Sequence, residues 1–256
     1  MVSTVKVLQL GDVSGSSGMG ALFLSLSSIV KEEKVDFIIA NGENASDGFG
    51  ISIDDYNNFL KMGIDVITSG NHIWQKEEIY QTLEKADNLL RPLNYPSGTI
   101  GKGYTVKNGI AVINAQGRYS MTPIDCPFQT VGALVEKLRK TTPLIFVDFH
   151  AEHTEEKEAL AFYLDGKVTC VAGTHTHVQT ADERILPGGT AYITDLGLTG
   201  VLDGVIGSRE DKAIERMLTQ LPIKSEVKEG KAHIQGIIVE ADAATGKALS
   251  IKRFSR

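Results

Sequence analysis

The chain has 256 residues, of which 42% are hydrophobic and 23% are charged, and it carries a formal net charge of −6. This composition is typical of a globular protein with a large core, and the length fits one α/β domain spanning residues 1–256. The acidic balance and the lack of a basic run argue against a groove for duplex nucleic acid, so an anionic substrate would need a local source of positive charge.

The start of the chain and the two cysteines bear on localisation. Residues 1–8 enter an expected strand directly, without the basic and apolar regions of a signal peptide. No apolar stretch approaches the roughly 20 residues of a membrane helix. Cys126 and Cys170 form no CxxC pair, and we expect both to be reduced thiols. These features predict a soluble, cytoplasmic protein that does not bind a membrane.

The first third of the chain alternates between two hydrophobic periods. Short β-branched runs predict strands, and apolar residues at helical spacing predict the helices between them. We expect strands at 5–10, 37–40 and 66–68, and helices at 19–33, 52–60 and 76–86. Ser52 opens the second helix as a capping box in which Asp55 replaces the usual glutamate. This β-α-β-α-β-α order predicts a parallel sheet with helices packed on it.

The rest of the chain adds antiparallel strands. Asn108-Gly109 lies between two β-prone runs and is a strong signal for a type I′ hairpin. Residues 196–208 are rich in glycine and are typical of a functional loop. Further strands are expected at 104–107, 110–114, 144–148, 168–172 and 191–194, helices at 131–139, 155–164 and 209–218, and a closing hairpin at 232–240 and 248–254.

Metal-ligating residue types recur where the expected strands end. Because the carboxyl ends of parallel strands meet at one edge of a sheet, these side chains are expected to converge. Each of them alone has an ordinary explanation, as a turn former or a packed histidine. Their joint occurrence favours a shared site. The candidate metal ligands are Asp12, Glu43, Asn44, Asn71, His150, His175 and His177.

These ligands suit a pair of metal ions that would act on a phosphate ester. Two ions about 3.5–4 Å apart clamp the attacking and leaving oxygens of a phosphoryl transfer. Glu43 is the natural bridge between them. Mixed oxygen and imidazole ligands suit iron, manganese or zinc. In extended backbone, His175 and His177 would point to the same side and could serve neighbouring ions.

His72 has two readings. It follows the better ligand Asn71, so it can lie beside the metal ions without binding them and protonate the leaving alkoxide. Alternatively, it orients Asn71. The proton-donor role is favoured. Asp195 follows another expected strand and is either a support for the ligands or a turn residue.

The motifs, taken in order, resemble the calcineurin-like metallophosphoesterases, and within them the bacterial YmdB-like branch. The resemblance implies a four-layer α/β/β/α sandwich with mixed sheets and the metal site at the carboxyl ends of the strands. It also implies a two-metal centre, often iron, and hydrolysis of cyclic nucleotides such as 2′,3′-cyclic AMP by a metal-bound hydroxide. The motifs that carry it are Gly11-Asp12, Gly42-Glu43-Asn44, Gly70-Asn71-His72, the segments 91–95 and 147–152 with His150, and Thr174-His175-Thr176-His177.

The resemblance also assigns a role to each residue. Asp12, Glu43, Asn44 and His177 would hold one ion. Glu43, Asn71, His150 and His175 would hold the other, and His72 would donate the proton. Other functions stay open: a broader phosphomonoesterase or phosphodiesterase, or a regulatory protein that senses nucleotides and turns over slowly.

The chain departs from the family pattern at three places. Ser14 replaces a histidine of the wider superfamily, a loss that the YmdB-like branch shares and for which Asn44 can compensate. Ser17-Gly18-Met19 replaces a Pro-Gly-Arg segment, and Gly200 is not followed by the expected proline, so we expect a more mobile loop there. The apolar segment 49–51 suggests a homo-oligomer.

Overall fold

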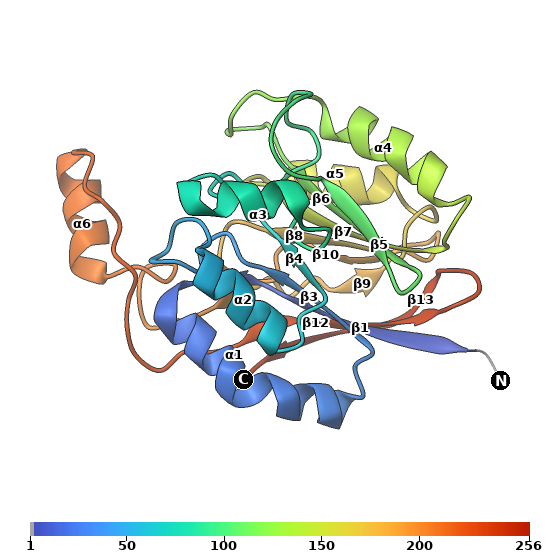
Figure 1. The fold of residues 1–256 in the computed structure, drawn as a ribbon, viewed down its shortest axis with the longest axis horizontal. Helices are drawn as coiled ribbons and strands as arrows, with labels where there is room; N and C mark the ends of the chain where they lie inside the picture. Colours follow the sequence, from blue (N-terminus) through green and yellow to red (C-terminus); the bar gives the residue numbers. More distant parts are fainter. Residues whose placement is uncertain (1–2) are drawn as a thin grey trace.

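The computed structural model describes residues 3–256, and its first large sheet is mixed (Figure 1). β1 pairs in parallel with β3, and β3 with β4, whereas β12 runs antiparallel to β1 and to β13. The order across the sheet is β13 (Ala248–Ser255), β12 (Gln235–Asp242), β1 (Thr4–Leu10), β3 (Phe37–Asn41) and β4 (Val66–Thr68). The parallel strands of the first third therefore lie together, as the sequence predicts.

The second large sheet has a parallel centre and antiparallel edges. β6, β7, β8 and β10 pair in parallel, and β5 and β9 join as antiparallel edge strands. The order is β5 (Tyr104–Lys107), β6 (Ile110–Gln116), β7 (Leu144–His150), β8 (Cys170–Thr174), β10 (Ala191–Ile193) and β9 (Arg184–Ile185). Two short parallel strands, β2 (Asp12–Val13) and β11 (Leu198–Thr199), form a separate ribbon that starts at the first candidate ligand.

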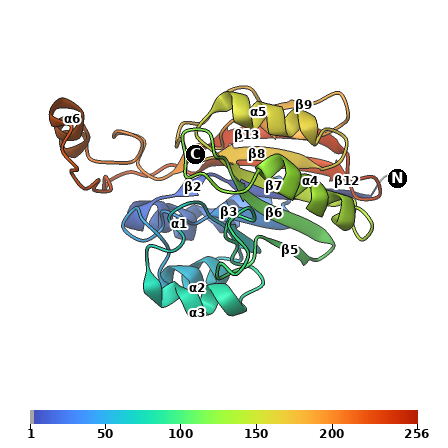
Figure 2. The ribbon, with the colours of Figure 1, turned by 90° about the horizontal axis from the view of Figure 1, so that it is seen from above.

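Helices cover the outer face of each sheet, and one helix projects from the body. Figures 1 and 2 both show α6 (Glu210–Thr219) standing apart from the two sheets. The first sheet is covered by α1 (Gly15–Glu33), α2 (Ile53–Lys61), the 3₁₀ helix η1 (Glu77–Ile79) and α3 (Tyr80–Lys85), and the second by α4 (Pro127–Leu138) and α5 (Thr154–Tyr163). Within residues 3–256, no helix combines the length and the apolar character needed to cross a membrane.

Alternating side chains build three separate layers of core. In β1, Val7 belongs to the cluster between the two sheets, and its neighbour Leu8 belongs to the cluster under the helices. In β7, Phe146 faces the first sheet and Val147 faces the second helical layer. Because successive side chains of a strand point to opposite faces, both sheets are buried on both sides. The four-layer α/β/β/α class predicted from the sequence is thus confirmed.

Several element boundaries differ from the predicted ones. α1 begins at Gly15 instead of residue 19, and α4 begins at Pro127 instead of residue 131. Proline suits the first turn of a helix, where its missing N–H costs nothing. The third expected helix is split into η1 and the short α3. The two-residue strands β2, β9 and β11 carry too little periodicity to be predicted.

Two predicted turn signals are confirmed in their local geometry. Asn108 and Gly109 both have positive φ, 52° and 77°, as a type I′ turn requires. Ser52 caps α2 by accepting the backbone N–H of Asp55 at 3.0 Å. The other half of the expected capping box is replaced, because Ser46 Oγ accepts the N–H of Ser52 at 2.7 Å.

Candidate metal centre

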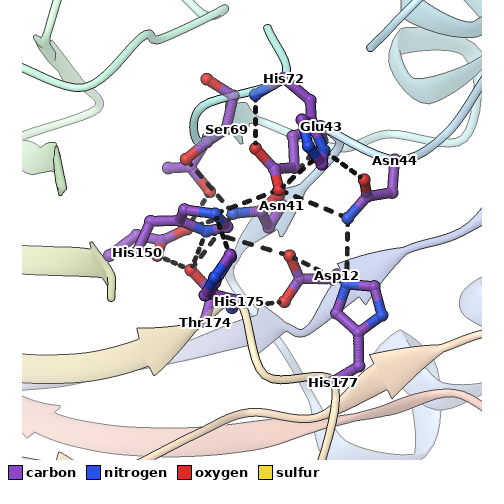
Figure 3. Close-up of polar contacts among 12 residues, drawn as sticks. Asp12, Asn41, Glu43, Asn44, Ser69, His72, His150, Thr174, His175 and His177 are labelled. Carbon is purple, nitrogen blue, oxygen red and sulfur yellow. Dashed lines mark hydrogen bonds and ion pairs between the residues drawn. The ribbon is translucent and has the colours of Figure 1, made fainter. Parts of the chain in front are cut away.

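The candidate ligands meet at the carboxyl ends of the parallel strands of both sheets (Figure 3). Asp12 follows β1, Glu43 follows β3, and Asn71 follows β4. From the opposing sheet, His150 ends β7 and His175 follows β8. The face-to-face packing of the sheets therefore brings together side chains that are far apart in the sequence.

Glu43 lies at the centre of the cluster and faces both sheets. Its Oε1 is 3.1 Å from His150 Nε2, and the same oxygen accepts a hydrogen bond from Asn44 Nδ2 at 3.4 Å. Its Oε2 accepts the backbone N–H of His72 at 3.1 Å. A side chain at Gly70 would come within 2.3 Å of the Glu43 carboxylate, so only glycine fits there. Glu43 thus contacts His150 of the second sheet and Asn44 and His72 of the loops that follow the first sheet.

The half of the cluster around His150 is buried and is supported by side chains from the interior. His150 is fully buried, and its Nδ1 pairs with Thr174 Oγ1 at 3.0 Å. Because Thr174 Oγ1 donates its own hydrogen to Asp148 at 2.7 Å, it accepts the proton of His150 Nδ1. The Nε2 atom of His150 therefore faces the site, 3.0 Å from His175 Nδ1 and 3.2 Å from Asn71 Oδ1.

The other half of the cluster, around His177 and Asn44, is more open and is supported by a backbone carbonyl. His177 Nδ1 donates to the carbonyl of Ile206 at 2.9 Å, so the lone pair of Nε2 faces the site. Nε2 lies 3.0 Å from Asn44 Nδ2 and 3.8 Å from Asp12 Oδ1. His150 and His177 thus each have their tautomer set by a hydrogen bond on the far side of the ring.

The backbone between the two halves is not extended. His175 and His177 have positive φ, 101° and 63°, a region that residues other than glycine rarely adopt. The expectation that extended backbone points both rings to one side is therefore wrong. The turn instead directs His175 towards His150 and His177 towards Asn44 (Figure 3). Asp12 Oδ2 helps to hold the turn by accepting the N–H of His175 at 3.1 Å.

A buried ion pair supports the same turn. Lys157 Nζ donates to Asp195 Oδ2 at 2.7 Å, and both side chains are excluded from solvent. The same oxygen accepts the N–H of Thr176 at 3.2 Å, and Oδ1 accepts the N–H of Gly197 at 2.9 Å. The Gly197 carbonyl in turn accepts the N–H of Asp12 at 3.0 Å. Of the two readings of Asp195, the geometry favours a support for the ligands.

His72 lies at the rim of the cluster with its ring against Asn44. Its Nδ1 is 3.0 Å from Asn44 Oδ1 and 3.6 Å from Glu43 Oε1, and its side chain is 24% exposed. Phe49 packs against the ring at 5.0 Å between centroids. Burial lowers the pKa of His72, although the Glu43 carboxylate opposes this shift. The ring contact is therefore with Asn44 rather than with Asn71, which the alternative reading would require.

The charges of the buried half are strongly coupled. Burial alone would raise the pKa of Glu43 and lower that of His150, but their contact reverses both shifts. The pKa of Glu43 falls to about 2 and that of His150 rises to about 9. Burial raises the pKa of Asp12 to about 6, and burial together with His150 lowers that of His175 to about 3. A cation at this site would compete with the proton on His150.

The residues fit a metal ion. Ligand atoms of Glu43, His150 and His175 all lie within 4.8 Å of one another. Asp12 Oδ1 is fully buried and has no hydrogen-bond partner among residues 3–256, a costly state for a carboxylate oxygen that a cation would relieve. Carboxylate oxygens, amides and imidazoles are the donors that iron, manganese and zinc accept.

Comparison with known proteins agrees with this geometry. A family model described as YmdB-like protein matches residues 8–254. The chain belongs to the YmdB-like family. It is 46% identical over 254 residues to a 2′,3′-cyclic-nucleotide 2′-phosphodiesterase of Bacillus subtilis, covering 98% of this chain and 96% of that protein. The predictions of this family and of an enzyme of the phosphoric diester hydrolase class are confirmed.

Two solved structures share the fold over nearly their whole length. A hypothetical protein from Thermus thermophilus superposes with a TM-score of 0.91 at 38% identity, covering 98% of this chain and 99% of that one. A novel phosphatase from Mycoplasma pneumoniae superposes with a TM-score of 0.93 at 32% identity, covering 100% and 94%. The YmdB-like fold thus extends over the entire described chain.

The departures of this YmdB-like chain from its branch lie in well-packed positions. Gly200, expected in a mobile loop, is pinned by two backbone hydrogen bonds to His233, of 2.9 and 2.8 Å. Met19, which stands where the branch has an arginine, is buried and belongs to the core under α1. Ile51 is fully buried and Phe49 is half-buried against His72, and the expected homo-oligomer stays a prediction.

Sequence reasoning missed most of the supporting residues. Asp148 and Thr174 orient His150, and Asn41 Nδ2 donates to Asp148 at 3.2 Å. One signal was available for Asp148, because it precedes His150 by two residues in the same strand and so shares its face. Lys157 had no sequence signal, since a single lysine on an amphipathic helix is usually exposed.

Proposed function

We propose that this protein is a two-metal phosphodiesterase that opens 2′,3′-cyclic nucleotides. The convergence of strand-end oxygen and imidazole donors around Asp12 Oδ1, which has no hydrogen-bond partner within residues 3–256, supports this proposal most strongly. The name of the Bacillus subtilis relative supplies the substrate class. A small phosphate ester also agrees with the acidic chain, in which metal ions would supply the missing positive charge.

The proposed ligand sets follow the two halves of the cluster. Asp12, Glu43, Asn44 and His177 would hold one ion on the open side. Glu43, Asn71, His150 and His175 would hold the other on the buried side. We propose iron for both positions, with manganese or zinc as substitutes that the donor set also accepts. When bound, the ions would polarise the phosphoryl group and lower the pKa of water near it.

His72 would act on the leaving group. Hydrolysis adds water at phosphorus, breaks the P–O2′ bond and leaves a 3′-phosphomonoester, so the departing 2′-oxygen needs a proton. His72 lies at the rim of the site, within reach of the cavity that holds Glu43 and His177. Because burial lowers its pKa, His72 is mostly neutral in the free protein at pH 7. The negative charge of a bound phosphate would favour its protonation.

A metal analysis followed by a substrate panel tests the proposal. Freshly purified protein should contain close to two ions per chain. The same sample should hydrolyse 2′,3′-cyclic AMP with a higher kcat/KM than 3′,5′-cyclic AMP or p-nitrophenyl phosphate. Equal values for all three substrates would instead favour the broad phosphatase and phosphodiesterase alternative. Tight nucleotide binding with negligible turnover would favour the regulatory alternative.

The role of His72 has a separate test. His72→Asn should lower kcat by about 10²–10⁴-fold, the usual contribution of a general acid, while the metal content stays that of the parent protein. His153→Asn is the matched control, because His153 pairs with Ser120 outside the cluster. Loss of metal from His72→Asn would contradict the proton-donor role and indicate a structural one.

A further inference from the structure

A projecting segment reaches back to the candidate metal centre. The segment is residues 202–228, here called the arm, and it carries α6 (Figure 2). Its two ends are tied together, because Ser208 bridges to Val227 and Lys228 donates its N–H to the Gly207 carbonyl at 2.8 Å. Val227 fits against Gly15 and Gly48, where a side chain at either glycine would come within 2.7 Å of it. The base of the arm is therefore fixed on the body.

The arm forms the outer wall of the cavity above the cluster. This cavity has a volume of about 190 Å³. Its inner side is lined by Glu43, Asn44, His72, His175 and His177, and its outer side by Ile206, Arg216, Ser225 and Val227 of the arm. A ligand that fills this cavity therefore contacts the arm as well as the cluster.

Arg216 is the arm's free positive charge at this cavity. The arm has five basic residues, and three of them form ion pairs within it. Arg216 is half-buried and lines the cavity, and it pairs with no carboxylate in the described part of the chain. Lys224, also without such a pair in residues 3–256, lines a neighbouring cavity with Phe49 and His72. The paired residues are Arg209 with Asp211 and Glu226, Lys212 with Glu215, and Lys228 with Glu210.

We propose that Arg216 binds a phosphate group of the substrate and thereby sets its affinity. The proposal rests on the proposed function of the site. A guanidinium presents a fork of N–H donors that matches two phosphate oxygens, and a half-buried position strengthens the contact. Arg209, which lines another cavity of the arm, is neutralised by Glu226 at 2.9 Å. At Arg216 the anionic ligand takes that place.

The phosphate bound by Arg216 has two possible positions in the substrate. It is either the phosphate that is hydrolysed or a second one attached to the 5′-oxygen of the same nucleotide. The two positions can be distinguished by the substrates whose binding depends on Arg216. A contact with the hydrolysed phosphate affects every substrate, whereas a contact with the second phosphate affects only those that carry it.

Steady-state kinetics of Arg216→Gln decide the proposal. Its KM should rise about 10–100-fold, the usual effect of losing a charge-assisted hydrogen bond, with kcat and metal content unchanged. The substrates are 2′,3′-cyclic AMP with and without a 5′-phosphate. An equal rise for both identifies the hydrolysed phosphate, and a rise only for the 5′-phosphorylated one identifies the second phosphate. Lys212→Gln, on the same helix but outside the lining of the cavity, should leave KM unchanged.

Two outcomes would overturn the proposal. The first is an unchanged KM of Arg216→Gln for both substrates. The second is the same rise in Lys212→Gln, which would indicate a general effect of the arm's charge. If the parent protein hydrolyses neither substrate, the proposed function is wrong, but the role of Arg216 is not yet decided. Calorimetric titration of the metal-loaded protein with inorganic phosphate then still tests Arg216, because Arg216→Gln should bind phosphate more weakly than Lys212→Gln.

Discussion

The two halves of the candidate centre are supported in different ways. His150 has no exposed surface and is oriented by Thr174 and Asp148, which belong to strands of the second sheet. His177 is 14% exposed and is oriented by the carbonyl of Ile206, which belongs to the arm. One half is thus built into the core, and the other depends on where a projecting segment lies.

This difference indicates that the two halves of the candidate centre have separate roles. A ligand held by buried strands keeps its geometry without help from the substrate. A ligand held by a loop carbonyl shares its support with the wall that the substrate contacts. If His177 binds a metal ion as proposed, a substrate that contacts the arm would affect that ion through Ile206, whereas the residues that orient His150 lie in the second sheet.

Removing Glu43, the proposed bridge, should have the largest effect, because its carboxylate contacts both His150 and Asn44. Glu43→Gln should release both ions and lower kcat/KM by about a thousandfold or more, since two ions supply several kcal/mol of transition-state stabilisation. Metal analysis and kinetics on one preparation measure both effects. Two ions retained per chain would refute the bridging role, and one retained ion would show that the halves bind independently.

Breaking the buried ion pair that supports the turn between the two halves should have a nearly as large effect, seen in the free energy of unfolding. Lys157→Met leaves the buried Asp195 carboxylate without its cation and should lower the free energy of unfolding by about 3–5 kcal/mol. Urea unfolding measures the change. The double variant Lys157→Met with Asp195→Asn removes the stranded charge and should recover part of the loss. A single variant within about 1 kcal/mol of the parent would show that the pair contributes little.

The fold and the convergence of the candidate ligands could be predicted from the sequence because both leave local signals. Strand periodicity places each strand end, and a parallel sheet brings the ends together without any further information. Glu43 and Asn71 were found in this way. The strained turn at His175 could not be found, because positive φ at a histidine has no sequence signature.

The residues that support the centre could not be predicted from the sequence either, for a related reason. Lys157 and Asp195 are 38 residues apart and meet only through the packing of α5 against β10 and its following loop. The sequence of α6 is that of an ordinary amphipathic helix, and nothing in it shows that Arg216 faces the cavity. Contacts between distant elements are decided by tertiary packing, which local patterns do not record.

The contact between His150 and Glu43 should make the metal-free protein less stable at alkaline pH than near pH 6. The pKa of His150 rises to about 9 in the folded chain from 6.5 when unfolded, so its pairing with Glu43 stabilises fully below pH 6.5. This contribution, on the order of 3 kcal/mol, is lost as the pH rises towards 9. Urea unfolding in chelator at pH 6 and pH 9.5 should show the loss, and His150→Gln should show a smaller one. An equal loss in both proteins would place its origin elsewhere.

The smallest effect should come from the hydrogen bond that orients His150. Thr174→Val keeps the shape of the side chain but removes the acceptor for His150 Nδ1, so metal affinity should fall about 10–100-fold while the fold is retained. Competition with a chelator measures the affinity. Thr176→Val is the matched control, because Thr176 Oγ1 accepts only the N–H of Val178, at 3.4 Å, among residues 3–256. Equal losses in the two variants would mean that the turn as a whole, rather than the core beneath His150, sets the affinity.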